Sequence, residues 1–421
     1  MMARLLYSFV IYLATPLILA RLLWRARKQP EYLRNLGERW ALYRRAAPRK
    51  LIWVHAVSVG ETRAAQPLVE AIRNAWPEHR ILLTCMTPTG REAGREVYGD
   101  RVIQTYLPYD YPGAVNRFFR HFSPAFGVLM ETEIWPNLLA GARRNGVPVI
   151  LANARLSERS ARGYAKVAVL ARPAFSALTA VAAQTAGDAR RIAGLGASNV
   201  SVCGNLKFDV TPAPEKLALG HTWRKALGER PVWLAASTRE GEEALVLEAW
   251  REIGTVSGQS APLLVIVPRH PQRFPEVAAL LARNGIDFVQ RSAGLPAGDT
   301  QAWLGDSMGE MAAYYALADI AFVGGSLLPL GGQNLIEAAA CGCPVVVGPH
   351  TLNFQQATED SIAAGAARRV VDPAELAVAI GQAFAKADEL AAMRTAAVRF
   401  AAAHRGATER TVAVIRSVVT D

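Results

Sequence analysis

Residues 51–61 read Leu51-Ile-Trp-Val-His-Ala-Val-Ser-Val-Gly-Glu61, a short apolar run followed at once by small and polar residues. Runs of this length that are rich in apolar and β-branched residues are typical of strands buried on both faces of a parallel sheet. Ser58-Val59-Gly60-Glu61 stands where a crossover helix should begin. The stretch therefore predicts one strand–helix unit of an α/β fold.

The same pattern recurs along the chain in two series. The first series of expected strands covers residues 51–57, 80–86, 102–108, 126–130, 147–152, 180–184 and 200–204, and the second covers residues 232–237, 263–268, 286–290, 302–305, 319–324 and 344–348. A break with two prolines, Thr211-Pro-Ala-Pro-Glu215, separates them. We predict two doubly wound Rossmann-like domains, residues 51–211 and 212–421, the second one including the C-terminal helices.

Length and composition agree with two domains. The chain has 421 residues, of which 51% are hydrophobic and 20% charged, which exceeds what one hydrophobic core usually covers and excludes a disordered or fibrous chain. The four cysteines form no Cys-x-x-Cys pair and no histidine cluster accompanies them. A disulfide scaffold or a structural zinc site is therefore not expected.

The positive charge is concentrated at the N-terminus. Residues 1–50 hold eleven Lys and Arg against two Glu, although the whole chain carries a net charge of +11, so the remaining residues are nearly neutral. A nucleic-acid partner is therefore not expected. Residues 5–20 carry no charge, and a helix of this length covers about 24 Å, a little less than the ~30 Å hydrocarbon core of a bilayer.

We predict that residues 1–24 are a membrane-anchor helix and that residues 25–50 are a basic juxtamembrane segment that contacts anionic lipid headgroups. The positive-inside rule then places the rest of the chain in the cytoplasm. A cleaved signal peptide is disfavoured because no small-residue cleavage site follows. A core helix is a minority alternative, and Pro16 leaves spanning and one-leaflet insertion both open.

Polar and glycine-rich segments follow the expected strands of the second domain. Open α/β sheets bind ligands at this edge. Residues 301–350 contain no Lys or Arg, so an anion there would be held by backbone amides and helix N-termini, with Arg239, Arg269 and Arg273 from neighbouring loops. No P-loop and no Gly-x-Gly-x-x-Gly motif follows a strand, which disfavours a P-loop ATPase and an ordinary NAD enzyme.

In the first domain, charged residues occupy the corresponding positions. Glu61 stands at an expected helix start, where the helix dipole should keep it ionised and able to act as a general base. Glu131 and Glu133 follow one expected strand, and Lys207 follows another. For each of these residues the sequence leaves open whether it is a cap or ion-pair partner or takes part in chemistry.

A dense series of motifs, from the N-terminal segment to about Phe354, resembles the 3-deoxy-D-manno-octulosonic acid (Kdo) transferases of lipopolysaccharide assembly. The motifs are His55-Ala-Val-Ser-Val-Gly-Glu61, Met86-Thr-Pro-Thr-Gly90, Leu107-Pro-Tyr-Asp110, Met130-Glu-Thr-Glu-Ile-Trp-Pro-Asn137, Asn153-Ala-Arg-Leu-Ser157, Leu206-Lys-Phe-Asp209, Pro268-Arg-His-Pro271, Gly305-Asp-Ser-Met-Gly-Glu310 and residues 324–337. Their shared order and spacing make the resemblance specific. It implies a GT-B fold, with two Rossmann-like domains and a cleft between them.

The resemblance also implies an activity. Family enzymes move Kdo from CMP-Kdo to the lipid A precursor, a tetraacyldisaccharide bisphosphate, at the cytoplasmic face of the inner membrane. They invert the anomeric centre and need no metal or cofactor beyond the donor. The N-terminal domain would bind the acceptor and the C-terminal domain CMP-Kdo.

The site residues follow from the same resemblance. Glu61 would be the general base, and Glu131 and Lys207 would stabilise the transition state. The CMP-Kdo site would be formed by Arg269, His270, Met308, Gly309, Glu310, Asn334, Leu335, Ile336 and Glu337. Where the family often has histidine, this chain has Gln333, so no imidazole acts there.

Several alternatives remain at this stage. Asn334 to Glu337 also fits a helix cap, and Glu38 is a rival base that more simply pairs with arginine. A GT-B epimerase, or a glycosyltransferase that uses a UDP-sugar, would share the fold. A membrane-tethered binding protein without catalysis is a third possibility.

Overall fold

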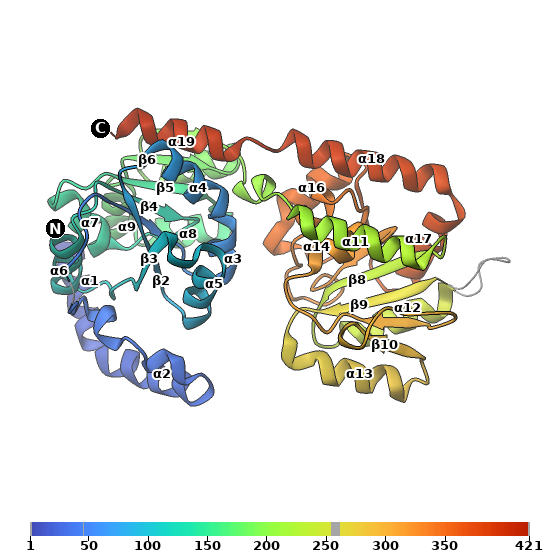
Figure 1. Ribbon diagram of the computed structural model, residues 1–421. Coiled ribbons are helices and arrows are strands. Elements are labelled where there is room, and N and C mark those ends of the chain that lie inside the picture. Colours follow the sequence, from blue (N-terminus) through green and yellow to red (C-terminus); the bar gives the residue numbers. More distant parts are fainter. Residues whose placement is uncertain (1, 45, 254–261, 420–421) are drawn as a thin grey trace. The chain divides into compact units, whose positions relative to one another are not determined.

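The computed structural model describes residues 2–44, 46–253 and 262–419. They form two compact units: residues 1–210 together with 405–421 make unit 1, and residues 211–404 make unit 2. Figure 1 labels the elements, and each unit is described by itself. The division lies next to the boundary expected at residue 211.

Unit 1 contains a parallel sheet with the strand order β3-β2-β1-β4-β5-β6-β7. Its strands are β1 (Leu51–His55), β2 (Arg80–Cys85), β3 (Val102–Tyr106), β4 (Phe126–Met130), β5 (Val149–Ala154), β6 (Ala180–Ala183) and β7 (Val200–Val202). After β3 the chain returns to the other side of β1, so β1 and β4 flank the point where the strand order reverses. In folds of this kind ligands bind at that point, beyond the carboxyl ends of the strands.

Helices cover both faces of this sheet (Figure 1). They are α3 (Val59–Ala64), α4 (Gln66–Ala75), α5 (Pro88–Tyr98), α6 (Pro112–Phe122), α7 (Pro136–Arg144), α8 (Glu158–Lys166), α9 (Ala168–Phe175) and α10 (Ala186–Gly194), with the 3-10 turns η1 (Pro30–Leu33), η2 (Leu36–Trp40), η3 (Gly99–Arg101) and η4 (Leu206–Asp209). Trp53 of β1 is fully buried, and a Cβ at Gly127 would lie 2.4 Å from its ring. The Trp53 ring can therefore lie over β4 only because position 127 is glycine.

Unit 2 repeats the architecture with the strand order β10-β11-β9-β8-β12-β13-β14. Its strands are β8 (Val232–Thr238), β9 (Leu263–Pro268), β10 (Phe288–Gln290), β11 (Ala302–Leu304), β12 (Ile320–Val323), β13 (Val345–Val347) and β14 (Ala367–Arg369). Its helices are α11 (Pro214–Leu227), α12 (Glu242–Ile253), α13 (Phe274–Arg283), α14 (Met311–Leu317), α15 (Ile336–Ala340), α16 (Gln355–Ala363), α17 (Pro373–Ala385) and α18 (Ala387–Ala403), with η5 (Pro271–Arg273), η6 (Arg291–Ala293) and η7 (Leu352–Phe354). Here β8 and β12 flank the reversal of strand order.

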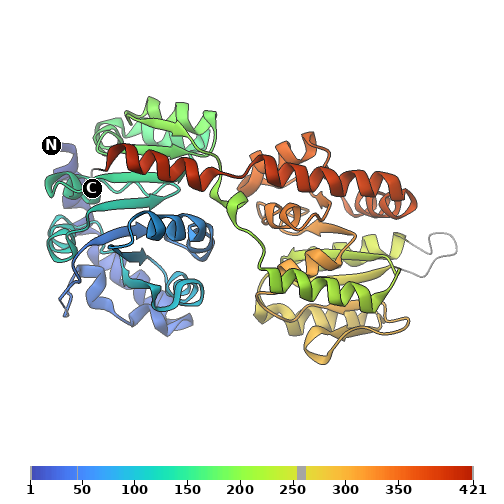
Figure 2. The same ribbon diagram turned by 45° about the horizontal axis from the view of Figure 1, so that its top comes forward.

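The last helix, α19 (Ala407–Val418), corrects the expected second domain, which ran to residue 421. α19 packs on α4 and β6 of unit 1 (Figure 2), and Ala407 and Ile415 are fully buried in the core there. Asp209 of η4 accepts hydrogen bonds from the backbone N–H groups of Gly406 at 2.7 Å and Thr408 at 2.5 Å. This carboxylate is the N-terminal cap that attaches α19 to unit 1.

The N-terminal segment forms two helices rather than the expected single one. α1 (Met2–Leu13) and α2 (Thr15–Lys28) meet at a bend of 50°, with Pro16 in the first turn of α2. Among the described residues no single helix has the length and apolar character needed to cross a membrane, although α1 and α2 together meet both criteria. The break has a physical reason, since proline has no N–H to donate and its ring crowds the preceding turn.

A buried polar network attaches α1 to unit 1. The Tyr7 hydroxyl donates to Asp110 Oδ2 at 3.0 Å, and Asn137 Nδ2 donates to Ser8 Oγ at 3.0 Å. Asp110 also accepts from the backbone N–H groups of Asn137 at 3.0 Å and Leu138 at 2.7 Å. One carboxylate therefore caps α7 and holds α1, and burial raises its pKa to about 6.

Candidate functional site

The acidic residues that the sequence singles out follow the two strands at the reversal of strand order in unit 1. Glu61 lies in α3, directly after β1, and Glu131 directly follows β4. Lys207 lies in η4, after β7. The fold brings these three residues together at the carboxyl edge of the sheet. Glu131 is near enough to Glu61 for its charge to raise the pKa of Glu61, and Lys207 Nζ lies 3.5 Å from Glu131 Oε1.

Glu61 is held by its own helix start. Val57 N–H donates to Glu61 Oε2 and the Ser58 hydroxyl donates to Oε1, both at 2.9 Å. Burial nevertheless raises the pKa of Glu61 to about 7, opposed by these hydrogen bonds and assisted by the charges of Glu131 and Glu133. This corrects the expectation that the helix dipole keeps Glu61 ionised, because burial outweighs it. A carboxyl group with this pKa is well matched to a general base near neutral pH.

The backbone of Glu131 is in the left-handed region, with φ of 59°. Its N–H donates to Ala152 O at 2.9 Å, which keeps it paired with β5 as it leaves the sheet. Non-glycine residues rarely adopt this conformation, and where they do it commonly serves a site. The side chains of Glu131 and Lys207 are 20% and 19% exposed, so solvent reaches this ion pair only partly.

Two residues of this site were not assigned a role from the sequence. Glu133 Oε2 accepts a hydrogen bond from Trp135 Nε1 at 2.7 Å and lies 4.0 Å from Nε2 of His55. His55 is fully buried, its Nδ1 hydrogen-bonds to Thr84, and its Nε2 has no hydrogen-bond partner among the described residues. Burial lowers the pKa of His55 to about 4 and raises that of Glu133. His55 is therefore neutral and adds no charge to the site.

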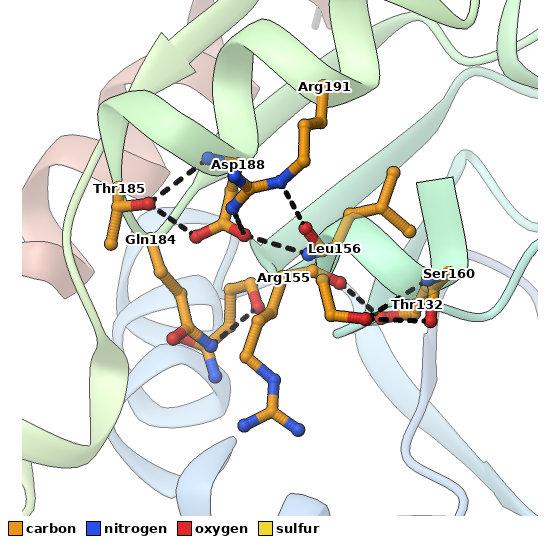
Figure 3. Close-up of polar contacts among 10 residues, drawn as sticks. Thr132, Arg155, Leu156, Ser160, Gln184, Thr185, Asp188 and Arg191 are labelled. Carbon is orange, nitrogen blue, oxygen red and sulfur yellow. Dashed lines mark hydrogen bonds and ion pairs between the residues drawn. The ribbon is translucent and has the colours of Figure 1, made fainter. Parts of the chain in front are cut away.

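The motif Asn153 to Ser157 is held by a dense set of hydrogen bonds (Figure 3). Asp188 Oδ1 accepts from Leu156 N–H at 2.9 Å, Arg191 Nε donates to Leu156 O at 2.5 Å, and Thr132 Oγ1 donates to Arg155 O at 2.5 Å. The guanidinium of Arg155 points away from this network. These contacts fix the backbone of Arg155, an exposed residue in the loop that follows β5. This loop lies at the same sheet edge as Glu131.

Glu38, the alternative candidate for the general base, forms contacts with Arg91 and Tyr106. Its carboxylate pairs with Arg91 Nη1 at 2.6 Å and accepts from Tyr106 N–H at 2.9 Å. This is the ion-pair role that the sequence favoured for it.

In unit 2, the loops after β8 and β12 approach closely at the reversal of strand order. A Cβ at Gly324 would lie 2.6 Å from Thr238 Cα, so only glycine fits there. Arg239 follows β8, and Arg269 and His270 follow β9. Burial and the positive charges of Arg239, Arg269 and Arg273 lower the pKa of His270. Arginines near enough to depress this imidazole create a positive edge suited to an anion.

The other expected donor-site residues differ in what their side chains can contact. Met308 is 52% exposed and Gly309 has a φ of 74°, whereas Glu310 pairs with Arg291 at 3.3 Å and accepts from the Ser307 hydroxyl at 2.5 Å. All three leave the carboxyl end of β11.

Asn334, Leu335, Ile336 and Glu337 surround the start of α15. Asn334 Oδ1 accepts from Ile336 N–H at 3.1 Å, and Leu335 and Ile336 are each 1% exposed. The side chains of Leu335 and Ile336 belong to the core, so these two residues could contact a donor only through their backbone groups. Glu337 is half-buried and lies near Tyr315 of α14.

The first two residues of α12, Glu242 and Glu243, organise this edge, and the sequence gives no role to either. Glu242 is fully buried and accepts from the backbone N–H groups of Gly325 at 2.5 Å, Ser326 at 2.9 Å and Leu327 at 3.1 Å. Glu243 is 1% exposed and pairs with Arg273 at 2.8 Å. Arg273 therefore stabilises the start of α12 through Glu243, and its contact with an anion stays a prediction.

Known structures identify the fold. A solved glycosyltransferase from Rickettsia africae is similar with a TM-score of 0.60, covering 88% of this chain and 99% of that chain at 12% identity. A UDP-GlcNAc 2-epimerase from Neisseria meningitidis, bound to UDP-GlcNAc, gives 0.61 over 87% of this chain and 100% of that chain at 14% identity. The fold is therefore GT-B-like, a class that holds both glycosyltransferases and epimerases.

Sequence relatives decide between a glycosyltransferase and an epimerase. A family model described as 3-deoxy-D-manno-octulosonic-acid transferase (kdotransferase) matches residues 34–210. The 3-deoxy-D-manno-octulosonic acid transferase of Bordetella pertussis is 45% identical over 434 residues, covering 98% of each chain. The chain belongs to the 3-deoxy-D-manno-octulosonic acid transferase family and is a glycosyltransferase.

Proposed function

We propose that this enzyme transfers Kdo from CMP-Kdo to a lipid A precursor, a tetraacyldisaccharide bisphosphate, with inversion at the anomeric carbon and without a metal. The observation that carries this proposal is Glu61, which has a pKa of about 7 and is held beside Glu131 and Lys207 at the reversal of strand order. A single inverting displacement needs one base, and this carboxyl group suits that role.

In the proposed step, Glu61 takes the proton of an acceptor hydroxyl while the hydroxyl oxygen attacks the anomeric carbon of Kdo. The bond between that carbon and the phosphate oxygen of CMP breaks, and its electron pair stays on the phosphate. Positive charge develops at the anomeric carbon, as in glycoside hydrolysis, and Glu131 stabilises it. Lys207 pairs with Glu131 and offsets negative charge on the leaving phosphate.

The departing CMP is already an anion, so no general acid is required. Arg239 and Arg269 supply the positive edge of unit 2 for the donor phosphate, and His270, whose pKa they lower, offers an imidazole hydrogen bond beside them. Gly309, Asn334 and the backbone of residues 335–336 contribute polar groups at the same edge, while Glu310 and Glu337 accept hydrogen bonds from the donor. Among the described residues no group of three or more His, Cys, Asp or Glu is arranged to hold a metal ion. Metal independence is part of the proposal and is tested with a chelator.

Arg155 has a proposed role in binding an acidic group of the substrates. Its backbone is fixed by Thr132 and by the contacts of Leu156, and its guanidinium points away from them (Figure 3). Kdo is an acid by name, and a planar guanidinium suits a carboxylate. Arg155→Ala should raise KM while leaving the pH profile of kcat unchanged.

The N-terminal helices have a proposed role in attachment to the cytoplasmic face of the inner membrane. One side of α1 hydrogen-bonds to Asp110 and Asn137, and the other exposes large apolar side chains. A helix tied to the protein in this way favours insertion into one leaflet over a span. The exposed cations of residues 21–50, such as Arg27, Lys28 and Arg34, would then contact anionic headgroups and the phosphates of the acceptor. Arg39 is buried in unit 1 and takes no part in this contact.

The test uses the purified full chain with CMP-Kdo and the tetraacyldisaccharide bisphosphate. We expect CMP release, a lipid mass increased by Kdo, an inverted anomeric configuration by NMR and no effect of EDTA. CMP should protect the enzyme from thermal unfolding and UDP should not. Activity with a UDP-sugar instead would favour an epimerase-like or UDP-dependent enzyme, and binding without transfer would favour a tethered binding protein.

A further inference from the structure

A cavity of about 450 Å³ lies between α1, α7 and α9 of unit 1. Its basic lining residues are Arg4, Arg143 and Arg144, and its apolar ones include Ala140, Val169 and Leu170. The volume is in the range of small-molecule sites. The three helices contact one another pairwise and lie together in unit 1 (Figure 1), so the cavity is part of a single packed unit.

The charges of this cavity are available to a ligand. Arg143 and Arg144 are exposed, and within the described residues their side chains form no hydrogen bond or ion pair. Arg4 acts electrostatically on Asp110, and no carboxylate lines the cavity. Guanidinium groups brought together without a matching carboxylate favour a phosphate, which they can bind through two parallel hydrogen bonds.

The surroundings of the cavity are apolar. Val169 is 79% exposed at its edge. The outer side of α1, with its continuation in α2, exposes Leu5, Leu6, Phe9, Leu13 and Leu17, each between 60% and 73% exposed. An exposed apolar surface of this kind marks an interaction site, and beside a basic pocket it matches a molecule with an acidic head and hydrocarbon tails.

The cavity is separate from the catalytic site. Glu61 lies at the carboxyl edge of the sheet, whereas Arg143 and Arg144 form the last turn of α7, which begins after β4 and leads to the start of β5. Arg143 and Arg144 therefore lie toward the amino edge, and α7 alone spans about 13 Å between the two edges. The cavity also reaches Pro136 at the start of α7, but a headgroup bound by Arg143 and Arg144 lies at the far end of this helix and is not positioned for reaction with Glu61.

We propose that this cavity binds the phosphate headgroup of an anionic membrane phospholipid, whose acyl chains continue along the exposed side of α1. This proposal rests on the proposed membrane attachment, because the membrane supplies the lipid. It does not depend on the transfer chemistry. Bound phospholipid would fix the orientation of unit 1 at the membrane by a specific contact, in addition to the general attraction of the basic N-terminal segment.

The test measures phospholipid retention by the detergent-solubilised full chain in native mass spectrometry, with phosphatidylglycerol and phosphatidylcholine as probes. We expect one phosphatidylglycerol per chain and no retained phosphatidylcholine. The double variant Arg143→Ala/Arg144→Ala should weaken retention at least tenfold. Arg120→Ala/Arg190→Ala removes the same charge from exposed positions elsewhere on unit 1 and should retain the lipid.

A second variant separates the cavity from general electrostatics. Ala140→Phe fills the cavity and keeps every charge, and it should also lose the phosphatidylglycerol. Undiminished retention by Ala140→Phe, or displacement of the lipid by millimolar inorganic phosphate, would overturn the proposal. Transfer to a detergent-dispersed acceptor should be unchanged in Ala140→Phe, and its loss would reassign the cavity to the acceptor. If the wild-type chain shows no transfer, the proposed function is refuted. The retention experiment would still test the proposed lipid site, because it does not depend on transfer.

Discussion

The raised pKa of Glu61 predicts an unusual dependence of transfer on pH. A general base acts only when ionised, so kcat/KM should follow the ionised fraction of Glu61 in the free enzyme. With a pKa of about 7, as burial and the charges of Glu131 and Glu133 give, that fraction falls about 16-fold between pH 7 and pH 5.5. An ordinary glutamate with a pKa of about 4.3 would lose less than about a tenth over the same range.

The assay measures initial rates of CMP release at subsaturating substrate between pH 5 and pH 8.5. Substrate phosphates also titrate in this range, so the control is the same profile for Glu131→Gln. This variant removes a negative charge that raises the pKa of Glu61, and the acid limb of its profile should move to lower pH even though its maximal rate is reduced. A wild-type profile that is flat down to pH 5, or an acid limb that Glu131→Gln leaves in place, would refute the reasoning.

Three further predictions concern the framework of the site. Asp209→Ala removes the cap of α19 and should lower the free energy of unfolding in urea by about 1–2 kcal/mol; unchanged stability would show that the cap is dispensable. The transfer rate should also fall, because η4 carries Lys207, for which we propose a role in catalysis. Gly324→Ala places a Cβ 2.6 Å from Thr238 Cα and should cost roughly 1–3 kcal/mol, whereas Gly381→Ala, in open space within a helix, should not lower the melting temperature. Tyr7→Phe loses the hydrogen bond to Asp110, worth about 1 kcal/mol, and should speed amide hydrogen exchange in residues 2–13; exchange at the wild-type rate would mean that this contact does not hold α1.

Much of the fold could be predicted from local patterns. The expected strands overlap β1 to β13 because each is a short apolar run bounded by polar or glycine-rich residues. β14 was missed because its residues, Ala367-Arg368-Arg369, carry two charges and only the alanine is buried. It is recognised as a strand only by its pairing with β13, which the sequence does not show.

Long-range contacts account for the larger errors. The packing of α19 on unit 1 depends on Asp209, which lies about two hundred residues earlier in the chain. The sequence likewise predicts that Glu242 and Glu243 lie in a polar segment after a strand, whereas both are buried. The Glu242 carboxylate accepts hydrogen bonds from backbone amides of the loop after β12. The Glu243 carboxylate is paired with Thr238 and Arg273. Only Thr238 is close in sequence to its partner; Arg273 is 30 residues from Glu243 and Ser326 is 84 residues from Glu242, so these contacts cannot be inferred from spacing.

The site could be predicted in position but not in its electrostatics. Glu61, Glu131 and Lys207 each follow a strand, and topology alone brings such residues to one edge. The helix dipole argues for an ionised Glu61, but burial by neighbouring elements raises its pKa and is invisible in a local motif. The motif that begins at His55 indicates no role for this histidine, because only the structure shows that it is buried beside Glu133.

The proposed role of Glu61 as the base of Kdo transfer is tested by comparing wild type with Glu61→Gln. Lipid product is followed by mass, and CMP-Kdo binding by calorimetry. We expect wild type to add Kdo to the lipid A precursor. The variant should bind CMP-Kdo with similar affinity but lose at least about 100-fold in kcat, the lower end of general-base contributions. Transfer by Glu61→Gln at the wild-type rate would contradict this role.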